Sequence, residues 1–90
     1  MSAVKFPLGR VVSTPGALEL LPQGKALAFL SRHVCGDWGD LCKEDQTANE
    51  VALRDGSRIL SAYHDENRTK FWIITEADRS VTTFLLPEEY

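Results

Sequence analysis

Lys70-Phe71-Trp72-Ile73-Ile74-Thr75 is the most apolar run of the sequence, and it decides the fold. Aromatic and β-branched residues in an unbroken run of this length favour a strand that is buried on both faces. Polar segments at 65–69 and 76–80 flank the run and are typical of hairpin turns. We therefore expect residues 70–75 to form the central strand of an antiparallel meander.

Three further strands are expected around this run. Residues 58–64 precede it and residues 81–86 follow it, and Pro87 is placed to end the last strand. Near the N-terminus, Val11 and Val12 favour a strand within residues 8–14. We expect this N-terminal strand to join the edge of the sheet.

The clearest helix is predicted around residues 26–34. Its apolar positions recur at the spacing of one helical face: Ala26, Phe29, Leu30, His33 and Val34. Gly36 can end this helix in a left-handed conformation. The strongest helical stripe and the most apolar strand should pack against each other. The core expected from this packing contains Phe29, Leu30, Phe71, Ile73 and Phe84.

A short helix is predicted before this one. Thr14-Pro15 is typical of a helix start, because Thr14 can cap free N–H groups and Pro15 suits the first helical position. Pro22 and Gly24 follow closely, so the helix cannot extend much beyond residue 21.

A third helix is expected to run from a cap at Asp37 or Asp40 to about Arg54, where Asp55-Gly56 stops it. Its apolar stripe is thin and consists of Leu41, Ala48, Val51 and Ala52. The whole pattern predicts one α+β domain over residues 1–90. It has an N-terminal strand, two to three helices and a three-stranded antiparallel meander packed on the helices.

The composition is that of an ordinary globular domain, and the charge bears on which classes of partner the protein can bind. The sequence has 90 residues, of which 43% are hydrophobic and 26% charged. Ten Lys and Arg face thirteen Asp and Glu, which gives a net charge of −3. A general electrostatic grip on nucleic acid is not expected at that balance.

The sequence also bears on compartment and cofactors. It has no apolar run long enough to span a membrane, and its first residues do not resemble a signal peptide. We therefore expect a cytoplasmic protein with reduced thiols. Cys35 and Cys42 are seven residues apart and have no second pair of ligands, so we expect neither a disulfide nor a metal, and no cofactor.

Three segments carry a resemblance to known proteins: LGRVVSTPGA at 8–17, RHVCGDWGD at 32–40 and IITEADRSVTTFLLPEEY at 73–90. They resemble a group of small, uncharacterised bacterial proteins carried on plasmids, phages and integron gene cassettes. The resemblance implies a setting on mobile genetic elements. It implies no activity, so no functional residue is carried over from that group.

The Gly36–Asp40 loop contains the first candidate site. Trp38 stands between two glycines and two aspartates, and an indole is costly to leave exposed. It can fold back as a lid on the core, or it can form the wall of a ligand groove; the lid is the favoured interpretation. Trp38, Asp37, Asp40 and the preceding Arg32 are the predicted binding residues.

A second set of polar residues suggests an alternative. A helical half bearing His33, followed by a meander with Arg79, Tyr63 and Thr83, resembles the layout of barnase-like and RelE-like ribonuclease toxins. In such enzymes a histidine with Arg and Thr or Tyr serves acid–base chemistry and stabilises charge on the phosphorus. The resemblance covers layout only, and the acidic composition counts against it. The bland interpretation of His33, a core or helix-terminal histidine, is preferred.

The favoured hypothesis is a non-enzymatic binding domain that meets a protein partner or a second copy of itself. An exposed sheet edge commonly pairs with another chain, and one core of this size is marginal alone, so the partner can be another protein or a second copy in a homodimer. The ribonuclease is the first alternative. A small-molecule sensor with a pocket between the helices and the sheet is the second.

Overall fold

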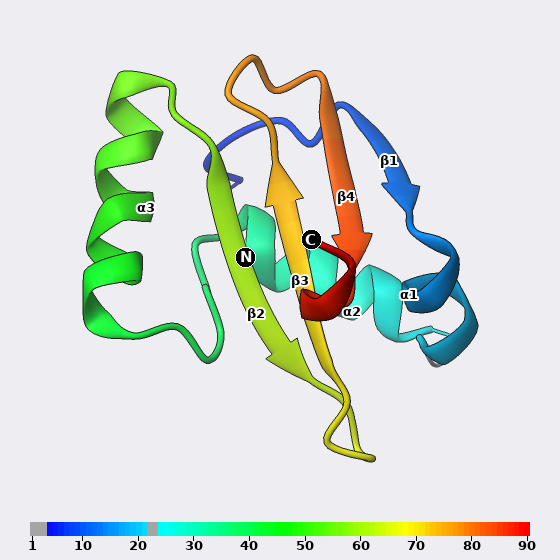
Figure 1. The fold of residues 1–90 in the computed structure, drawn as a ribbon. Helices are drawn as coiled ribbons and strands as arrows, with labels where there is room; N and C mark the ends of the chain where they lie inside the picture. The colour runs from blue at the N-terminus through cyan, green and yellow to red at the C-terminus, as the bar shows by residue number, and fades with distance from the viewer. Residues whose placement is uncertain (1–3, 22–23) are drawn as a thin grey trace.

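The computed structural model describes residues 4–21 and 24–90 and has the expected α+β class (Figure 1). Its elements in chain order are β1 (Arg10–Ser13), α1 (Pro15–Leu20), α2 (Lys25–Val34), α3 (Lys43–Asp55), β2 (Ile59–His64), β3 (Lys70–Thr75), β4 (Val81–Leu85) and the 3₁₀ helix η1 (Pro87–Glu89). Among the described residues, no helix is long and apolar enough to cross a membrane.

The four strands form one sheet in the order β1-β4-β3-β2. The predicted meander is confirmed, because β2 and β3, and β3 and β4, pair antiparallel. The N-terminal strand also joins the edge, as expected, but it runs parallel to β4. The sheet is therefore mixed and four-stranded, whereas the sequence predicted a purely antiparallel sheet of three strands with the fourth at its edge. The three helices between β1 and the meander return the chain to the same end of the sheet, and this produces the parallel pair.

The helices cover the sheet unequally. In Figure 1, α2 lies behind the sheet, α3 stands beside β2, and only η1 crosses the front. The main core lies between α2 and the sheet and contains Ala17, Phe29, Tyr63, Phe71, Ile73, Phe84 and Leu86. Four of the five predicted core residues belong to it. The fifth, Leu30, is half-buried and packs at its margin.

A second, smaller core was not anticipated. Phe6, Trp38, Ala52 and Ile59 bury one another between the N-terminal segment, the Gly36–Asp40 loop, α3 and β2. Phe6 lies in a segment without secondary structure, so no periodicity marks it as buried. This cluster closes the end of the molecule where α3 meets the sheet.

The helix ends follow the predicted signals. The hydroxyl of Thr14 accepts a hydrogen bond from the N–H of Ala17 at 3.3 Å, and Pro15 is the first helical residue. Gly36 and Gly56 follow α2 and α3 with φ of 88° and 81°, as expected of glycines that end helices. Pro22, which was expected to limit the first helix, lies outside the described residues.

The start of the third helix was predicted wrongly. Helix α3 begins at Lys43, and neither Asp37 nor Asp40 caps it, since Cys42 occupies the cap position without a side-chain hydrogen bond. The physical reason is that the loop first pairs with β2: the N–H of Asp40 donates to the carbonyl of Ala62 at 2.7 Å. The predicted stripe of α3 is only partly correct: Ala52 is buried as expected, whereas Ala48 and Val51 are exposed and Asn49 is buried instead.

Gly39 is required where the loop meets β2. Its φ is 73°, and a Cβ at this position would lie 2.0 Å from the carbonyl oxygen of Ala62. Any side chain would therefore force the loop away from the strand. The glycine allows residues 38–40 to pair with β2 as a short parallel bridge.

The packing of α2 yields a test of the main core. The ring of Phe29 stacks on Tyr63 at 5.0 Å between centroids and tilts against Phe71 at 6.2 Å. Phe29→Ala is expected to lower the free energy of unfolding by about 3–5 kcal/mol through lost contacts and a cavity. Leu27→Ala on the same helix is the matched control, because Leu27 is 73% exposed. Urea titrations of both variants measure the effect, and equal midpoints would contradict the packing.

Candidate functional site

His33 is the most completely buried titratable candidate, and it lies inside a chain of hydrogen bonds. Its Nδ1 is 2.5 Å from the hydroxyl of Ser61, and its Nε2 is 2.9 Å from the hydroxyl of Thr75. Thr75 in turn is 2.7 Å from Thr82, whose hydroxyl donates to the carbonyl of Leu8 at 2.6 Å. We call these groups the buried polar chain; it joins α2, all three meander strands and the N-terminal segment.

The last acceptor of the buried polar chain fixes the direction of its hydrogen bonds back to Nε2 of His33. A carbonyl oxygen only accepts, so the hydroxyl proton of Thr82 is used there and Thr82 must accept from Thr75. Thr75 then accepts from the Nε2–H of His33. The Nδ1 atom of the neutral ring is left to accept from Ser61. The chain thus places a proton on Nε2, and burial, which lowers the pKa of this imidazole, keeps Nδ1 unprotonated.

Burial sets the acid–base character of His33. Desolvation lowers the pKa of this imidazole from 6.5 to about 4, because the charged form would lose its hydration. Both ring nitrogens are occupied by partners inside the protein. The geometry is that of a core histidine, which was the bland interpretation of this residue.

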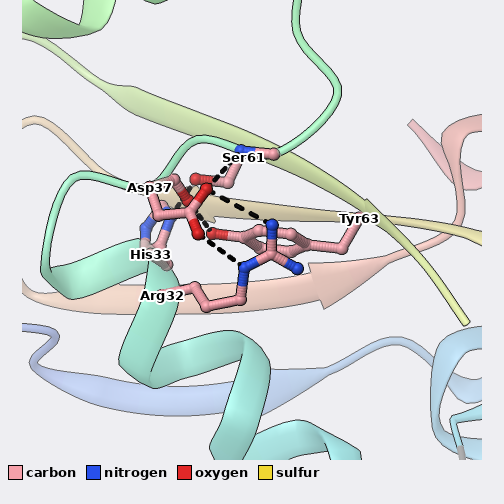
Figure 2. Close-up of polar contacts among 6 residues, drawn as sticks. Arg32, His33, Asp37, Ser61 and Tyr63 are labelled. Carbon is pink, nitrogen blue, oxygen red and sulfur yellow. Dashed lines mark hydrogen bonds and ion pairs between the residues drawn. The ribbon is translucent and has the colours of Figure 1, made fainter.

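Two of the four predicted binding residues, Arg32 and Asp37, come together at the end of α2 (Figure 2). Arg32 donates to both carboxylate oxygens of Asp37, at 2.8 and 3.3 Å, and its guanidinium lies 4.5 Å from the centroid of the Tyr63 ring. The Tyr63 hydroxyl donates to the carbonyl of Asp37 at 2.5 Å. The ion pair lowers the pKa of Asp37, while burial raises the pKa of Tyr63 to about 12. These contacts hold the loop against α2 and β2.

Asp40 forms a separate exposed pair with His64, which sequence analysis did not single out. The two side chains come from the end of the loop and the end of β2. Both pairs in this region, Arg32–Asp37 and Asp40–His64, are about half exposed. Pairs at this exposure contribute little to stability.

Trp38 itself is buried, with 5% of its surface exposed. Its ring stacks over Phe6 at 6.3 Å and meets His33 edge-on at 6.1 Å, and its Nε1–H donates to Glu50 of α3 at 2.9 Å. The indole thus covers the seam between α2, α3 and β2, which is the lid interpretation. The exposed groups of this loop are the two aspartates.

The residues of the ribonuclease hypothesis do not surround one exposed cleft. His33 and Tyr63 lie buried on the sheet face under α2, whereas Thr83 alternates onto the opposite face. Arg79 donates to the backbone carbonyls of Ser57 at 2.7 Å and Ala52 at 3.1 Å. Its guanidinium therefore ties the turn after β3 to the end of α3. The described residues also enclose no pocket of the kind that the sensor hypothesis needs.

The cysteines and acidic groups are dispersed. Cys35 is half-buried, Cys42 is exposed, and both are free thiols. Within residues 4–21 and 24–90, no three side chains of His, Cys, Asp or Glu are grouped closely enough to hold a metal ion.

The two edges of the sheet differ in how far other parts of the chain cover them. Along β2, residues 38–40 pair with Ala62, and Asn49 extends this cover. The Asn49 amide donates to the carbonyl of Leu60 at 2.6 Å and accepts from the N–H of Leu60 at 3.1 Å, as a neighbouring strand would. Sequence reasoning missed Asn49. The available signal was its position three residues before Ala52, which places both side chains on the same face of the helix.

The outer edge of β1 has no such cover among the described hydrogen bonds. The N–H groups of Arg10 and Thr14 point inward and donate to Ser80 and Phe84 of the β4 side, each at 2.9 Å. Because successive peptide groups of a strand alternate, the N–H and C=O of Val11 and Ser13 point outward. Val11 is also 45% exposed.

Comparisons with known proteins add no function to this geometry. The chain matches no family model, and no curated protein or solved structure is similar to it. The resemblance to proteins of mobile elements stays a prediction.

The burial of Trp38 can be tested by truncation. Trp38→Ala is expected to lower the free energy of unfolding by about 3–5 kcal/mol, because it opens the second core beside Phe6. Trp38→Phe should cost less, since it keeps most of the apolar contact. Chemical denaturation measures both. Strong quenching of Trp38 by acrylamide in a Trp72→Phe background, with an unchanged Trp38→Ala midpoint, would refute the lid.

His33 should make the protein sensitive to acid. Its pKa is about 4 in the folded protein against 6.5 ordinarily, so below pH 6.5 the unfolded chain binds a proton that the folded protein does not. The stability from this group is complete above pH 6.5 and is lost as the pH falls towards 4, by roughly 3 kcal/mol. Urea titrations across this window measure the loss.

His64→Gln is the control for this measurement, because it removes the exposed histidine and keeps the buried one. Its acid sensitivity between pH 6.5 and 4 should resemble that of the parent protein. Nitrogen-15 spectra of the imidazoles should show the proton of His33 on Nε2. A His33 ring that titrates near pH 6.5, or that carries its proton on Nδ1, would rule out the assignment.

Proposed function

We propose that the protein is a non-enzymatic binding domain that acts by accepting a β-strand at the outer edge of β1. The observation that supports this most strongly is the contrast between the edges. A loop, a required glycine and a buried asparagine block the edge of β2, whereas Val11 and Ser13 of β1 present outward N–H and C=O groups. Open strand edges of this kind pair readily with other strands.

The occupant we propose is the β1 strand of a second copy. In an antiparallel pair centred on Val12, Val11 of each copy lies opposite Ser13 of the other. Every outward backbone group of these two residues then finds a partner. The arrangement is self-complementary, which a twofold dimer requires.

Exposed apolar residues near β1 support self-association. Leu18 and Leu20 of α1, the helix that follows β1 directly, are 69% and 50% exposed. In Figure 1, β1 and α1 lie at the same side of the molecule. A chain of 90 residues buries a modest core, so a dimer interface would add useful stability.

The biological setting is part of the proposal. The resemblance to proteins carried on plasmids, phages and integron cassettes supports an accessory role on a mobile genetic element. The two free cysteines suit a reducing cytoplasm. In this setting the domain would act by assembly, with itself in the first instance.

Val11→Lys tests the proposed dimer. A lysine on the outer edge places a charge where the second strand would pair, so the variant is expected to be monomeric. Leu27→Lys is the matched control, since it adds the same charge at an exposed apolar site on α2. Sedimentation velocity should give the parent and the Leu27→Lys protein twice the monomer mass of 10.1 kDa.

Two results would reject the proposal. One is a parent protein that stays monomeric at the highest soluble concentration. The other is a Val11→Lys variant that dimerises as well as the parent. In either case the β1 edge would not be the contact surface.

A further inference from the structure

The sheet face opposite α2 is the largest feature that the proposed dimer does not use. Strand alternation and register place on it Arg10, Val12, Leu60, Ala62, His64, Lys70, Trp72, Ile74, Val81, Thr83 and Leu85. We call this surface the open face; Ala62, Ile74 and Leu85 on it are buried. In Figure 1, η1 is the one described helix that crosses the open face, while all the longer helices lie behind or beside the sheet.

Aromatic rings lie in the middle of the open face. The ring of Tyr90 meets Trp72 edge-to-face with 5.7 Å between centroids, and the guanidinium of Arg58 lies 5.5 Å from the centroid of the Tyr90 ring. Tyr90 is 67% exposed and Trp72 is half-buried. Two aromatic rings packed edge-to-face and a planar cation are therefore gathered over β2 and β3.

Basic residues lie at both ends of this aromatic centre. Arg58 and Arg10 belong to the end of the sheet next to Glu76, and Lys70 begins β3 at the other end, about 20 Å away along the strand. All three side chains are exposed, and none takes part in the ion pairs found among the described residues.

The acidic groups near the open face are fewer. Glu76 lies between the two arginines, and Glu88 is exposed on η1. Asp40 is paired with His64. Glu89 is turned towards α1, where it accepts from the N–H of Gly16 at 3.0 Å. The strand positions themselves therefore carry more positive than negative charge.

We propose that the open face binds single-stranded nucleic acid. Unpaired bases would stack on Tyr90 and Trp72, and phosphates would lie near Arg58, Arg10 and Lys70. A sheet that presents aromatic rings and cations together is suited to this ligand, because every base has a π face and stacking tolerates any sequence. A duplex hides the faces of its bases and would find only the few positive charges.

The net charge of −3 is consistent with binding in which base stacking contributes more affinity than charge does. It argues against a general electrostatic grip on nucleic acid, and stacking does not need one. With three cations at the surface, the slope of log affinity against log salt should be no steeper than about −2. Binding that depends more steeply on salt would require a different surface.

The experiment uses a short fluorescein-labelled oligothymidylate and its duplex with oligoadenylate, followed by fluorescence anisotropy. The single strand is expected to bind the parent protein more tightly than the duplex does. Tyr90→Ala should weaken binding about tenfold or more, whereas Tyr90→Phe should retain it because the ring is kept. In a Trp38→Phe background, the single strand should quench the emission of Trp72.

Charge variants separate stacking from electrostatics. Lys70→Gln should reduce the salt slope by about 0.7, whereas Lys43→Gln on α3, with the same change in net charge, should leave it unchanged. Circular dichroism establishes that each variant is folded. No binding of the single strand, equal binding of the duplex, or an unchanged affinity in folded Tyr90→Ala would each overturn the proposal.

Discussion

The buried polar chain from Ser61 to the carbonyl of Leu8 is the constraint on which the rest of the structure depends. A histidine and three hydroxyl groups inside a small core would be costly if any of them lacked a partner. Within the described part of the chain, every buried side-chain nitrogen and oxygen atom has one. The cost is avoided only if β3 and β4 keep the register that sets Thr75 opposite Thr82, and only if α2 delivers His33 between β2 and β3. The final acceptor, Leu8, extends the same requirement to the N-terminal segment, where Phe6 then closes over His33.

The closing of this seam explains how one sheet edge is blocked. Trp38 packs beside Phe6 and His33, and this brings residues 38–40 alongside β2. Helix α3 follows, and its Asn49 completes the cover of that edge. Among the residues that the structure describes, no comparable element reaches β1, because α1 begins directly after it and packs towards the end of β4. The asymmetry of the edges is thus a consequence of where the chain places its loop and helices after β1, and it leaves β1 as the strand available to a partner.

Local sequence signals predicted the helices and strands well, but they did not predict contacts between residues far apart in the chain. A few neighbouring residues are enough to predict the apolar strand at 70–75, the apolar stripe of α2 and the helix cap at Thr14. The role of His33 is set by Ser61 and Thr75, which are 28 and 42 positions away. Asp37 and Asp40 were expected to cap a helix because aspartates before a helix usually do so. They instead pair with Arg32 and His64, and the second partner lies on a strand that the loop meets only in the folded protein. Arg32 and Asp37 were both named as binding residues from the sequence, but the ion pair between them was not predicted. The roles of Phe6, Asn49 and Tyr90 depend on neighbours that no spacing in the sequence reveals.

The proposed dimer and the open face are related by geometry. The twofold axis between two antiparallel strands is perpendicular to their sheet, so pairing β1 with its own copy would keep both open faces on the same side. The two sheets would then form one continuous surface of eight strands. Arg10 of each copy would lie near the centre of this surface, and the Tyr90–Trp72 clusters would lie one on each side. A single strand that reached both clusters would gain affinity from the second contact without any new chemistry, because that contact becomes intramolecular once the first has formed. Self-assembly at β1 would in this way convert two modest stacking sites into one longer site.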